Sequence, residues 1–199
     1  MQSEYLRAAQ RGSAAAFESL MGEYEKKIYG LCLRMMGNVH DGEDAAQEAM
    51  IRIWQKIGQC RDAQALSTWI YRVTASACTD AIRKRAKKSA SSLEIMREDG
   101  FDPADSAPTP EQAAQDAERS EALARAIAEV PPEMRSVFLL RDVHALSVEQ
   151  TAKALGITQG TVKSRLFRAR ERIAKAMRES GTMDGYERQE EKRRQPDAV

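Results

Sequence analysis

The stretch from Leu146 to Ile173, LSVEQTAKALGITQGTVKSRLFRARERI, constrains the fold of this chain more than any other feature. Ser147 is a good N-cap residue, and Gln150 three positions later completes the spacing of a capping box. Gly156 can take the left-handed backbone conformation that ends a helix, and Thr158 can cap the helix that follows. The stretch therefore predicts two helices joined by a turn of about three residues, a helix-turn-helix.

The second helix of this pair has an apolar side and a polar, basic side. Val162, Leu166, Ala169 and Ile173 fall three and four residues apart and are expected to face inward. The residues left mostly outward or flanking are Gln159, Thr161, Lys163, Ser164, Arg165 and Arg168. Such side chains pair with phosphates and with base edges in the DNA major groove, where a helix-turn-helix inserts its second helix. The alternative is a solvated basic face on an ordinary helical hairpin.

The rest of the chain also shows helical spacing, and strand patterns are almost absent. The apolar spacing predicts one helix over Ala14–Met36, which Gly37 and Asn38 stop. A second helix, capped by Asp41, is expected to run to about Ile57. Its apolar face is predicted to comprise Ala46, Ala49, Met50, Ile53, Trp54 and Ile57. A third begins near Ser67 and ends in a basic block. The predicted fold class is all-α.

Charge divides the chain into segments. The 31 basic and 30 acidic residues nearly cancel, but residues 83–88 are basic, and residues 163–178 carry seven basic side chains and one acid. Residues 94–121 carry nine acids and two arginines. The Ser, Asp, Ala and Pro content of residues 89–112 is typical of a linker. We therefore expect two small helical domains, residues 1–88 and 113–178. A flexible acidic linker over 89–112 would join them, and a polar, disordered tail would follow over 179–199.

Several classes of protein are disfavoured. No segment is long and apolar enough to span a membrane, and the N-terminus lacks the apolar core of a signal peptide. Cys32, Cys60 and Cys78 form no C-x-x-C pair, which favours free thiols in a reducing cytoplasm and gives no metal site. Cys32 and Cys78 are expected to be buried, whereas Cys60, in a predicted loop, is expected to be more exposed. No cofactor is predicted.

Three segments carry a resemblance to extracytoplasmic-function (ECF) sigma factors of the sigma-70 family. VPPEMRSVFLLRDV and the helix-turn-helix after it resemble region 4, including its Gly-Thr-Val-Lys-Ser-Arg-Leu-x-Arg-Ala-Arg helix. DGEDAAQEAMIRIWQKI and LSTWIYRVTASACTDAIRKRAKK resemble region 2. Departures from the family pattern are Gln150-Thr151-Ala152 for Glu-Ile-Ala, Met50 for Phe, and Ser76 for a frequent Asn. The resemblance covers about three-quarters of the chain.

The resemblance implies three sites. It assigns the minus-thirty-five promoter element to Thr158, Gln159, Thr161, Lys163, Ser164, Arg165 and Arg168 of the helix-turn-helix described above. It assigns the minus-ten element, and capture of an unstacked base, to the third helix and the loop before it: Arg61, Trp69, Arg72, Ser76, Thr79, Arg83 and Lys84. Trp69 could alternatively be a core residue. The polymerase core is assigned to the second helix, where an exposed Ile lies among carboxylates and amides: Asp41, Asp44, Gln47, Glu48, Ile51, Arg52 and Gln55.

The function implied is that of an alternative sigma factor that directs RNA polymerase to promoters and is not itself an enzyme. Its expected partners are core polymerase (the beta-prime clamp helices and the beta flap), promoter DNA and an anti-sigma factor. It would be cytoplasmic without membrane insertion of its own, and an anti-sigma partner could hold it at the membrane. Two alternatives remain. One is a conventional helix-turn-helix regulator that acts without polymerase. The other is a DNA-processing enzyme such as a serine recombinase, which would need strands that the sequence does not predict.

Overall fold

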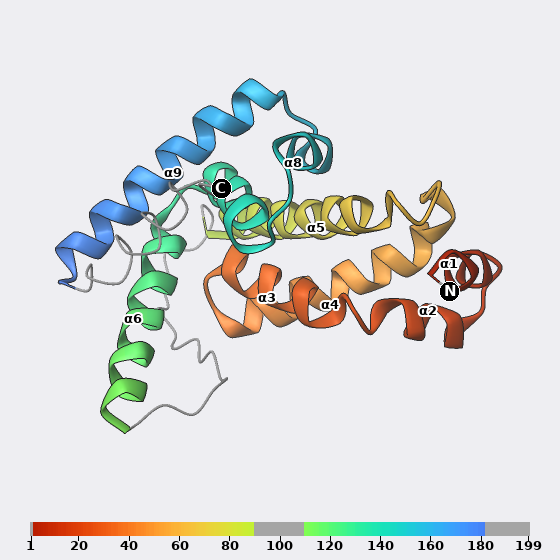
Figure 1. Ribbon diagram of the computed structural model, residues 1–199, viewed down its shortest axis with the longest axis horizontal. Helices are drawn as coiled ribbons and strands as arrows, with labels where there is room; N and C mark the ends of the chain where they lie inside the picture. Colours follow the sequence, from red (N-terminus) through yellow and green to blue (C-terminus); the bar gives the residue numbers. More distant parts are fainter. Residues whose placement is uncertain (1, 90–109, 182–199) are drawn as a thin grey trace, which may run out of the picture.

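The computed structural model describes residues 2–89 and 110–181, and every regular element within them is helical (Figure 1). The predicted all-α fold is confirmed. Most of the predicted linker and tail lies outside the described residues. The first half comprises α1 (Gln2–Gln10), α2 (Ala14–Met21), α3 (Glu25–Met36), α4 (Val39–Lys56), the short 3-10 helix η1 (Ile57–Gln59) and α5 (Leu66–Ser89). The second comprises α6 (Pro110–Glu129), α7 (Pro132–Phe138), the π-helical turn η2 (Leu139–Val143), α8 (Val148–Leu155) and α9 (Gln159–Glu179).

The helix predicted over Ala14–Met36 is two helices, so that prediction was wrong. The chain leaves α2 at Gly22, whose N–H donates to the carbonyl of Glu18, and re-enters a helix at Glu25. Leu20, Met21 and Tyr24 on the two sides of the break are all buried. Because the apolar stripe continues through the turn, the periodicity could not reveal it. The sequence also gave no prediction of α1.

Asn38, rather than Asp41, caps α4. The backbone of Asn38 is extended, its side-chain oxygen accepts from the N–H of Asp41 at 2.9 Å, and α4 begins at Val39. Gly37 ends α3 in the left-handed conformation, with φ 77°, as its position in the sequence predicts. The predicted cap was therefore wrong by three residues. Asp41 lies in the first turn of α4, and its backbone N–H donates the hydrogen bond that the capping side chain of Asn38 accepts.

The helix-turn-helix forms as its local chemistry predicts. Ser147 Oγ accepts from the N–H of Gln150 at 3.0 Å, and Gln150 Oε1 accepts from the N–H of Ser147 at 2.8 Å, which completes the capping box. Gly156 ends α8 with φ 65°, and Thr158 Oγ1 accepts from the N–H of Thr161 at 3.2 Å to begin α9.

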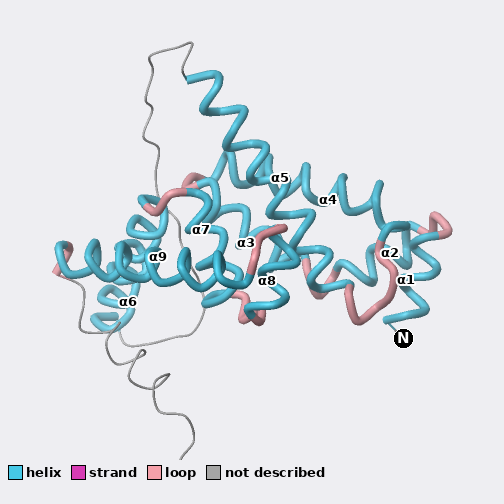
Figure 2. The backbone as a smooth tube through the Cα atoms, turned by 90° about the horizontal axis from the view of Figure 1, so that it is seen from above, coloured by secondary structure: helices cyan, strands magenta, loops and turns pink. Residues whose placement is uncertain are grey.

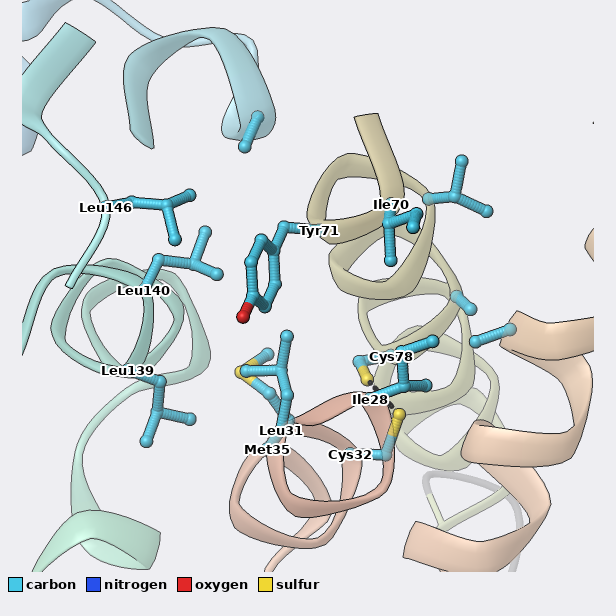
Figure 3. Close-up of a cluster of buried hydrophobic side chains, with 14 of the residues drawn as sticks. Ile28, Leu31, Cys32, Met35, Ile70, Tyr71, Cys78, Leu139, Leu140 and Leu146 are labelled. Carbon is cyan, nitrogen blue, oxygen red and sulfur yellow. Dashed lines mark hydrogen bonds between the residues drawn. The ribbon is translucent and has the colours of Figure 1, made fainter. Parts of the chain in front are cut away.

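The two halves pack against each other and share a hydrophobic core. The molecule is elongated, with α1 and α2 at one end and α6 and α9 at the other (Figure 2). α8 packs on α5 between these ends. Figure 3 shows Tyr71 of α5 pointing toward Leu140 and Leu146 of the second half, and Leu31 and Met35 of α3 also lie in this cluster.

Hydrogen bonds also cross between the halves. The Tyr71 hydroxyl lies 3.2 Å from Nδ1 of His144, and Arg135 donates from Nη1 to the carbonyl of Met35 at 2.5 Å. Arg135 is buried, and it donates as well to the carbonyls of Val130 and Ala128 in its own half. Burial, with smaller contributions from the positive charges of Arg34 and Lys27, lowers the pKa of His144 to about 4. The halves therefore form a docked unit.

Candidate nucleic-acid and partner interfaces

The outer face of α9 carries the residues predicted to read DNA. Val162, Leu166, Ala169 and Ile173 are buried, which confirms the predicted inward stripe. Of the predicted readers, Thr158, Gln159, Lys163, Ser164 and Arg168 are exposed, and Thr161 and Arg165 are partly buried. Ser164 Oγ donates to the carbonyl of Thr161 at 3.1 Å. The helix thus presents hydroxyl, amide and cationic groups side by side, the set that binds phosphates and base edges.

Two arginines of α9 are tied to the helices beneath it. Arg165 Nη2 donates to Glu133 Oε2 at 2.7 Å, and Arg170 forms a bidentate pair with Asp142 at 2.8 and 2.7 Å. Asp142 is largely buried, so the second pair fixes α9 on η2. Glu133 is exposed, so Arg165 can exchange this partner for a phosphate without leaving a buried charge unpaired.

Phe167 was missed in the sequence reasoning. Its side chain is the most exposed large apolar group among the described residues, at 64%. It follows buried Leu166 and precedes Arg168 on the outer surface of α9. An aromatic ring in this place can contact the methyl group of thymine in the major groove. Phe167 lies outside the three- and four-residue spacing of the buried stripe, and this departure could have identified it as an exposed apolar residue from the sequence.

The polar face of α5 is a second cationic surface. Arg72, Ser76, Arg83 and Lys84 are exposed, as is Arg61 in the loop before the helix. Thr79 on the same face is partly buried, and its hydroxyl donates to the carbonyl of Ala75 at 2.8 Å. Arg72, Ser76, Thr79 and Arg83, spaced by four, three and four residues, therefore share one face of α5.

Trp69 does not belong to that exposed surface. Its side chain is only 6% exposed and packs in the core of the first half. A buried ring offers no free face for a base to stack on, so the structure favours the core alternative for this residue. Cys60, expected to be more exposed, is also buried, because the loop folds its side chain inward and Sγ donates to the carbonyl of Asp62 at 3.4 Å.

The outer face of α4 carries an apolar patch within a polar surround. Ile51 is 45% exposed, as predicted, and Asp44, Gln47, Glu48 and Gln55 on this helix are also exposed. Trp54 was predicted to face inward, but it is 37% exposed and its ring packs edge-on against Phe17, with centroids 4.8 Å apart. Ile51 and Trp54 lie three residues apart and so adjoin on the helix surface.

Asp41 and Arg52, also predicted on this face, are engaged with α5. Arg52 pairs with Glu48 and with Asp80 of α5, each at 2.6 Å, and Asp41 pairs with Arg85 at 2.6 Å. The Arg52–Asp80 and Asp41–Arg85 pairs connect α4 to α5, so Arg52 and Asp41 help to orient the two helices.

Other kinds of site find little support in the described part of the chain. Residues 2–89 and 110–181 hold no group of three or more His, Cys, Asp or Glu that could hold a metal ion. Within the same ranges no helix is long and apolar enough to cross a membrane. The buried thiols of Cys32 and Cys78 lie 3.5 Å apart, and the hydrogen bond that Cys78 donates to Cys32, together with burial, raises the pKa of Cys32. A raised pKa makes the Cys32 thiol a poor nucleophile.

Comparison with known proteins identifies the family. The family model "Sigma-70 region 2" matches residues 20–88, and "Sigma-70, region 4" matches residues 120–173. The ECF RNA polymerase sigma factor SigW of Bacillus subtilis is 34% identical over 184 residues, which cover 90% of this chain and 98% of that protein. This chain belongs to the ECF sigma factors. The RNA polymerase sigma-H factor of Pseudomonas aeruginosa is 33% identical over 172 residues, 84% of this chain and 89% of that protein.

Solved structures support the fold of this sigma factor. The sigma factor RpoE of Bartonella quintana, in complex with the anti-sigma factor NepR, superposes with a TM-score of 0.68 at 20% identity. The match covers 81% of this chain and 96% of that one. CnrH in complex with the cytosolic domain of CnrY gives a TM-score of 0.62 at 16% identity, covering 88% of this chain and 96% of that one. Region 2 thus contains α3–α5, region 4 contains the helix-turn-helix, and α1 lies outside both matched segments.

Proposed function

We propose that this sigma factor binds core RNA polymerase through the outer face of α4 and recognises promoters with two separate DNA-reading surfaces. In this proposal α5 and the loop over residues 58–65 bind and open the minus-ten element. The exposed face of α9 binds the minus-thirty-five element. The chain supplies binding and positioning, and the polymerase supplies the chemistry.

The observation that carries the proposal is the presence of two exposed cationic helix faces in one chain. Arg72, Arg83 and Lys84 lie on α5, whereas Lys163 and Arg168 lie on α9. A conventional helix-turn-helix regulator needs one reading helix in each subunit and repeats it by dimerisation. A chain with a second DNA-reading helix and an apolar protein-binding face on α4 suits a subunit that binds two promoter elements for RNA polymerase.

The patch formed by Ile51 and Trp54 supports the polymerase contact. An exposed aromatic and a branched aliphatic side chain, surrounded by carboxylates and amides, have the composition of an interface centre with a polar rim. The exposed Asp44, Gln47, Glu48 and Gln55 provide the rim. A helical partner with complementary basic and apolar side chains, such as the polymerase clamp helices, fits this surface.

The docked arrangement of the halves supports control by an anti-sigma factor. Elements named for positions minus ten and minus thirty-five lie about 25 base pairs, or about 85 Å, apart on straight duplex DNA. α8 packs directly on both α5 and α9, so it holds these two reading helices close together. In this arrangement α5 and α9 are too close to occupy both promoter elements at once. We propose that the docked form is the resting state and that binding to polymerase separates the halves. A protein that binds the docked form would inhibit the sigma factor by mass action.

Run-off transcription tests the function. Purified core polymerase, with and without this protein, would transcribe a template library randomised at the minus-ten and minus-thirty-five elements. The proposal predicts sequence-selective transcripts only when the protein is present, with enrichment at both elements. Transcript yields equal to those of core polymerase alone would refute it. Enrichment of an inverted-repeat DNA site without polymerase would instead favour the conventional regulator.

A further inference from the structure

A single side-chain amide connects the first helix to the loop before α5. Gln10, the last residue of α1, donates from Nε2 to the carbonyls of Cys60 at 2.8 Å and Ile57 at 3.3 Å. α1 lies beside the connection between α4 and α5 in Figure 1, as its packing against η1 requires. A primary amide has two N–H donors, so these two carbonyls use its whole donor capacity.

The same loop is held at further points. The N–H of Cys60 donates to the carbonyl of Ile57 at 3.1 Å, and the buried Cys60 thiol donates to the carbonyl of Asp62 at 3.4 Å. Asp62 Oδ1 accepts from the N–H of Ala65 at 2.7 Å at the entrance to α5. Between these points Arg61 and Gln64 remain exposed. Hydrogen bonds to the protein side of the loop therefore hold its backbone in place, while the Arg61 and Gln64 side chains face solvent.

Gln10 is not needed to hold α1 in place. Leu6 and Ala9 of α1 are buried in the core, and Gln2 donates from Nε2 to the Tyr24 hydroxyl at 3.3 Å. α1 also packs closely on α2. The two hydrogen bonds of Gln10 therefore serve mainly to hold the backbone carbonyls of Ile57 and Cys60, at the start of the loop, in place.

We propose that Gln10 is a positioning residue for recognition of the minus-ten element. The inference rests on the proposed function, which assigns binding and opening of the minus-ten element to α5 and the loop over residues 58–65. A loop ordered before binding does not lose conformational freedom when it captures a base, so the affinity for the correct base is higher. Gln10 touches no DNA in this proposal. It acts through the backbone of Ile57 and Cys60.

Three variants test the role. Gln10→Met preserves the length of the side chain and removes both donors, whereas Gln10→Lys restores N–H donors at the end of an unbranched chain. Ser3→Ala, an exposed change on the same helix, is the matched control. Each variant, with core polymerase, would transcribe the library randomised at both promoter elements, and its melting temperature would be measured in parallel.

The proposal predicts a selective loss. For Gln10→Met, enrichment of the preferred minus-ten sequences should fall at least about threefold, while enrichment at minus-thirty-five stays within about twofold of wild type. Gln10→Lys should recover most of the minus-ten preference, and Ser3→Ala should match wild type. A purely structural role would lower total yield and affect both elements alike, and that result would overturn the proposal. Unchanged minus-ten preference in Gln10→Met would overturn it too. Absence of selective transcripts with the wild-type protein would instead refute the proposed function, and this inference with it.

Discussion

Replacement of Gly42 by Ala tests the packing that orients the proposed polymerase-binding helix. Gly42 is buried in the first turns of α4, where α4 crosses α3. A methyl group on its Cα would lie 2.9 Å from the Cα of Leu33 and 2.5 Å from Leu33 Cδ2. The Leu33 side chain could rotate away, but its backbone cannot, so the two helices must separate. The region 2 segment that DGEDAAQEAMIRIWQKI resembles begins Asp-Ala-Glu-Asp in the family, with Ala where Gly42 stands, so the prediction runs against the family pattern.

The magnitude follows from two opposing effects. Gly to Ala within a helix stabilises by about 0.5–1 kcal/mol, because Ala loses less backbone entropy on folding. Overpacking a well-packed contact costs about 1–3 kcal/mol. The contact with Leu33 involves backbone, so we expect the second effect to prevail and the free energy of unfolding to fall by about 1–2 kcal/mol. For a protein of this size each kcal/mol lowers the melting temperature by about 2–4 °C.

Thermal and urea unfolding followed by circular dichroism would measure this change. Gly160→Ala is the matched control, since its methyl group would meet only Thr158 Oγ1 at 3.8 Å. The control should be as stable as wild type or slightly more stable. If Gly42→Ala equals Gly160→Ala in stability, the close approach of α3 and α4 is not as described.

Three further predictions concern the interfaces. Because the pKa of His144 is lowered to about 4, its neutral form stabilises the docked fold above pH 6.5, and this stability is lost as the pH falls toward 4. Wild type should lose about 3 kcal/mol more than His144→Asn between pH 7 and pH 4 in urea unfolding, and equal losses would contradict the assignment. Glu133→Gln frees Arg165 from an exposed ion pair, so it should tighten duplex binding up to about fivefold in a salt-controlled anisotropy assay, whereas weaker binding would argue against a DNA contact by Arg165. Ile51→Asp should weaken core-polymerase binding at least about tenfold while stability stays within about 0.5 kcal/mol, and unchanged binding would exclude this face.

The helix-turn-helix was predictable from the sequence because its determinants are local. Ser147, Gly156 and Thr158 each make their contacts within a few residues, and all three adopt the predicted conformations. The inward stripe of α9 follows from spacing alone. Where the controlling interactions are local, single-sequence reasoning reaches the correct geometry.

The contacts of the two tryptophans were not predictable in this way. Periodicity placed Trp54 inward, but its ring packs at the surface against Phe17 of α2, an element that the sequence did not separate from α3. For Trp69 the sequence left a DNA contact and a core position both open, and the ring is buried in the core. Helical spacing identifies a face, but the helix that covers each part of that face is determined by the tertiary packing.

The docking of the two halves is the largest feature outside the sequence prediction. Tyr71 is buried by residues about 70 positions later in the chain, among them Leu140 and Leu146. The sequence indicated two tethered domains and gave no sign of a shared core. The roles of the individual DNA-binding and polymerase-binding residues stay predictions, because they depend on partners that the chain itself does not contain.

Promoter opening provides the most direct test of the central claim. Permanganate reactivity of thymines in the minus-ten element would be measured on a promoter selected from the library, with core polymerase alone, this protein alone and both together. The account predicts reactive, unpaired thymines only when both are present. Reactivity with core polymerase alone, or none with the two together despite tight duplex binding by this protein, would contradict the account.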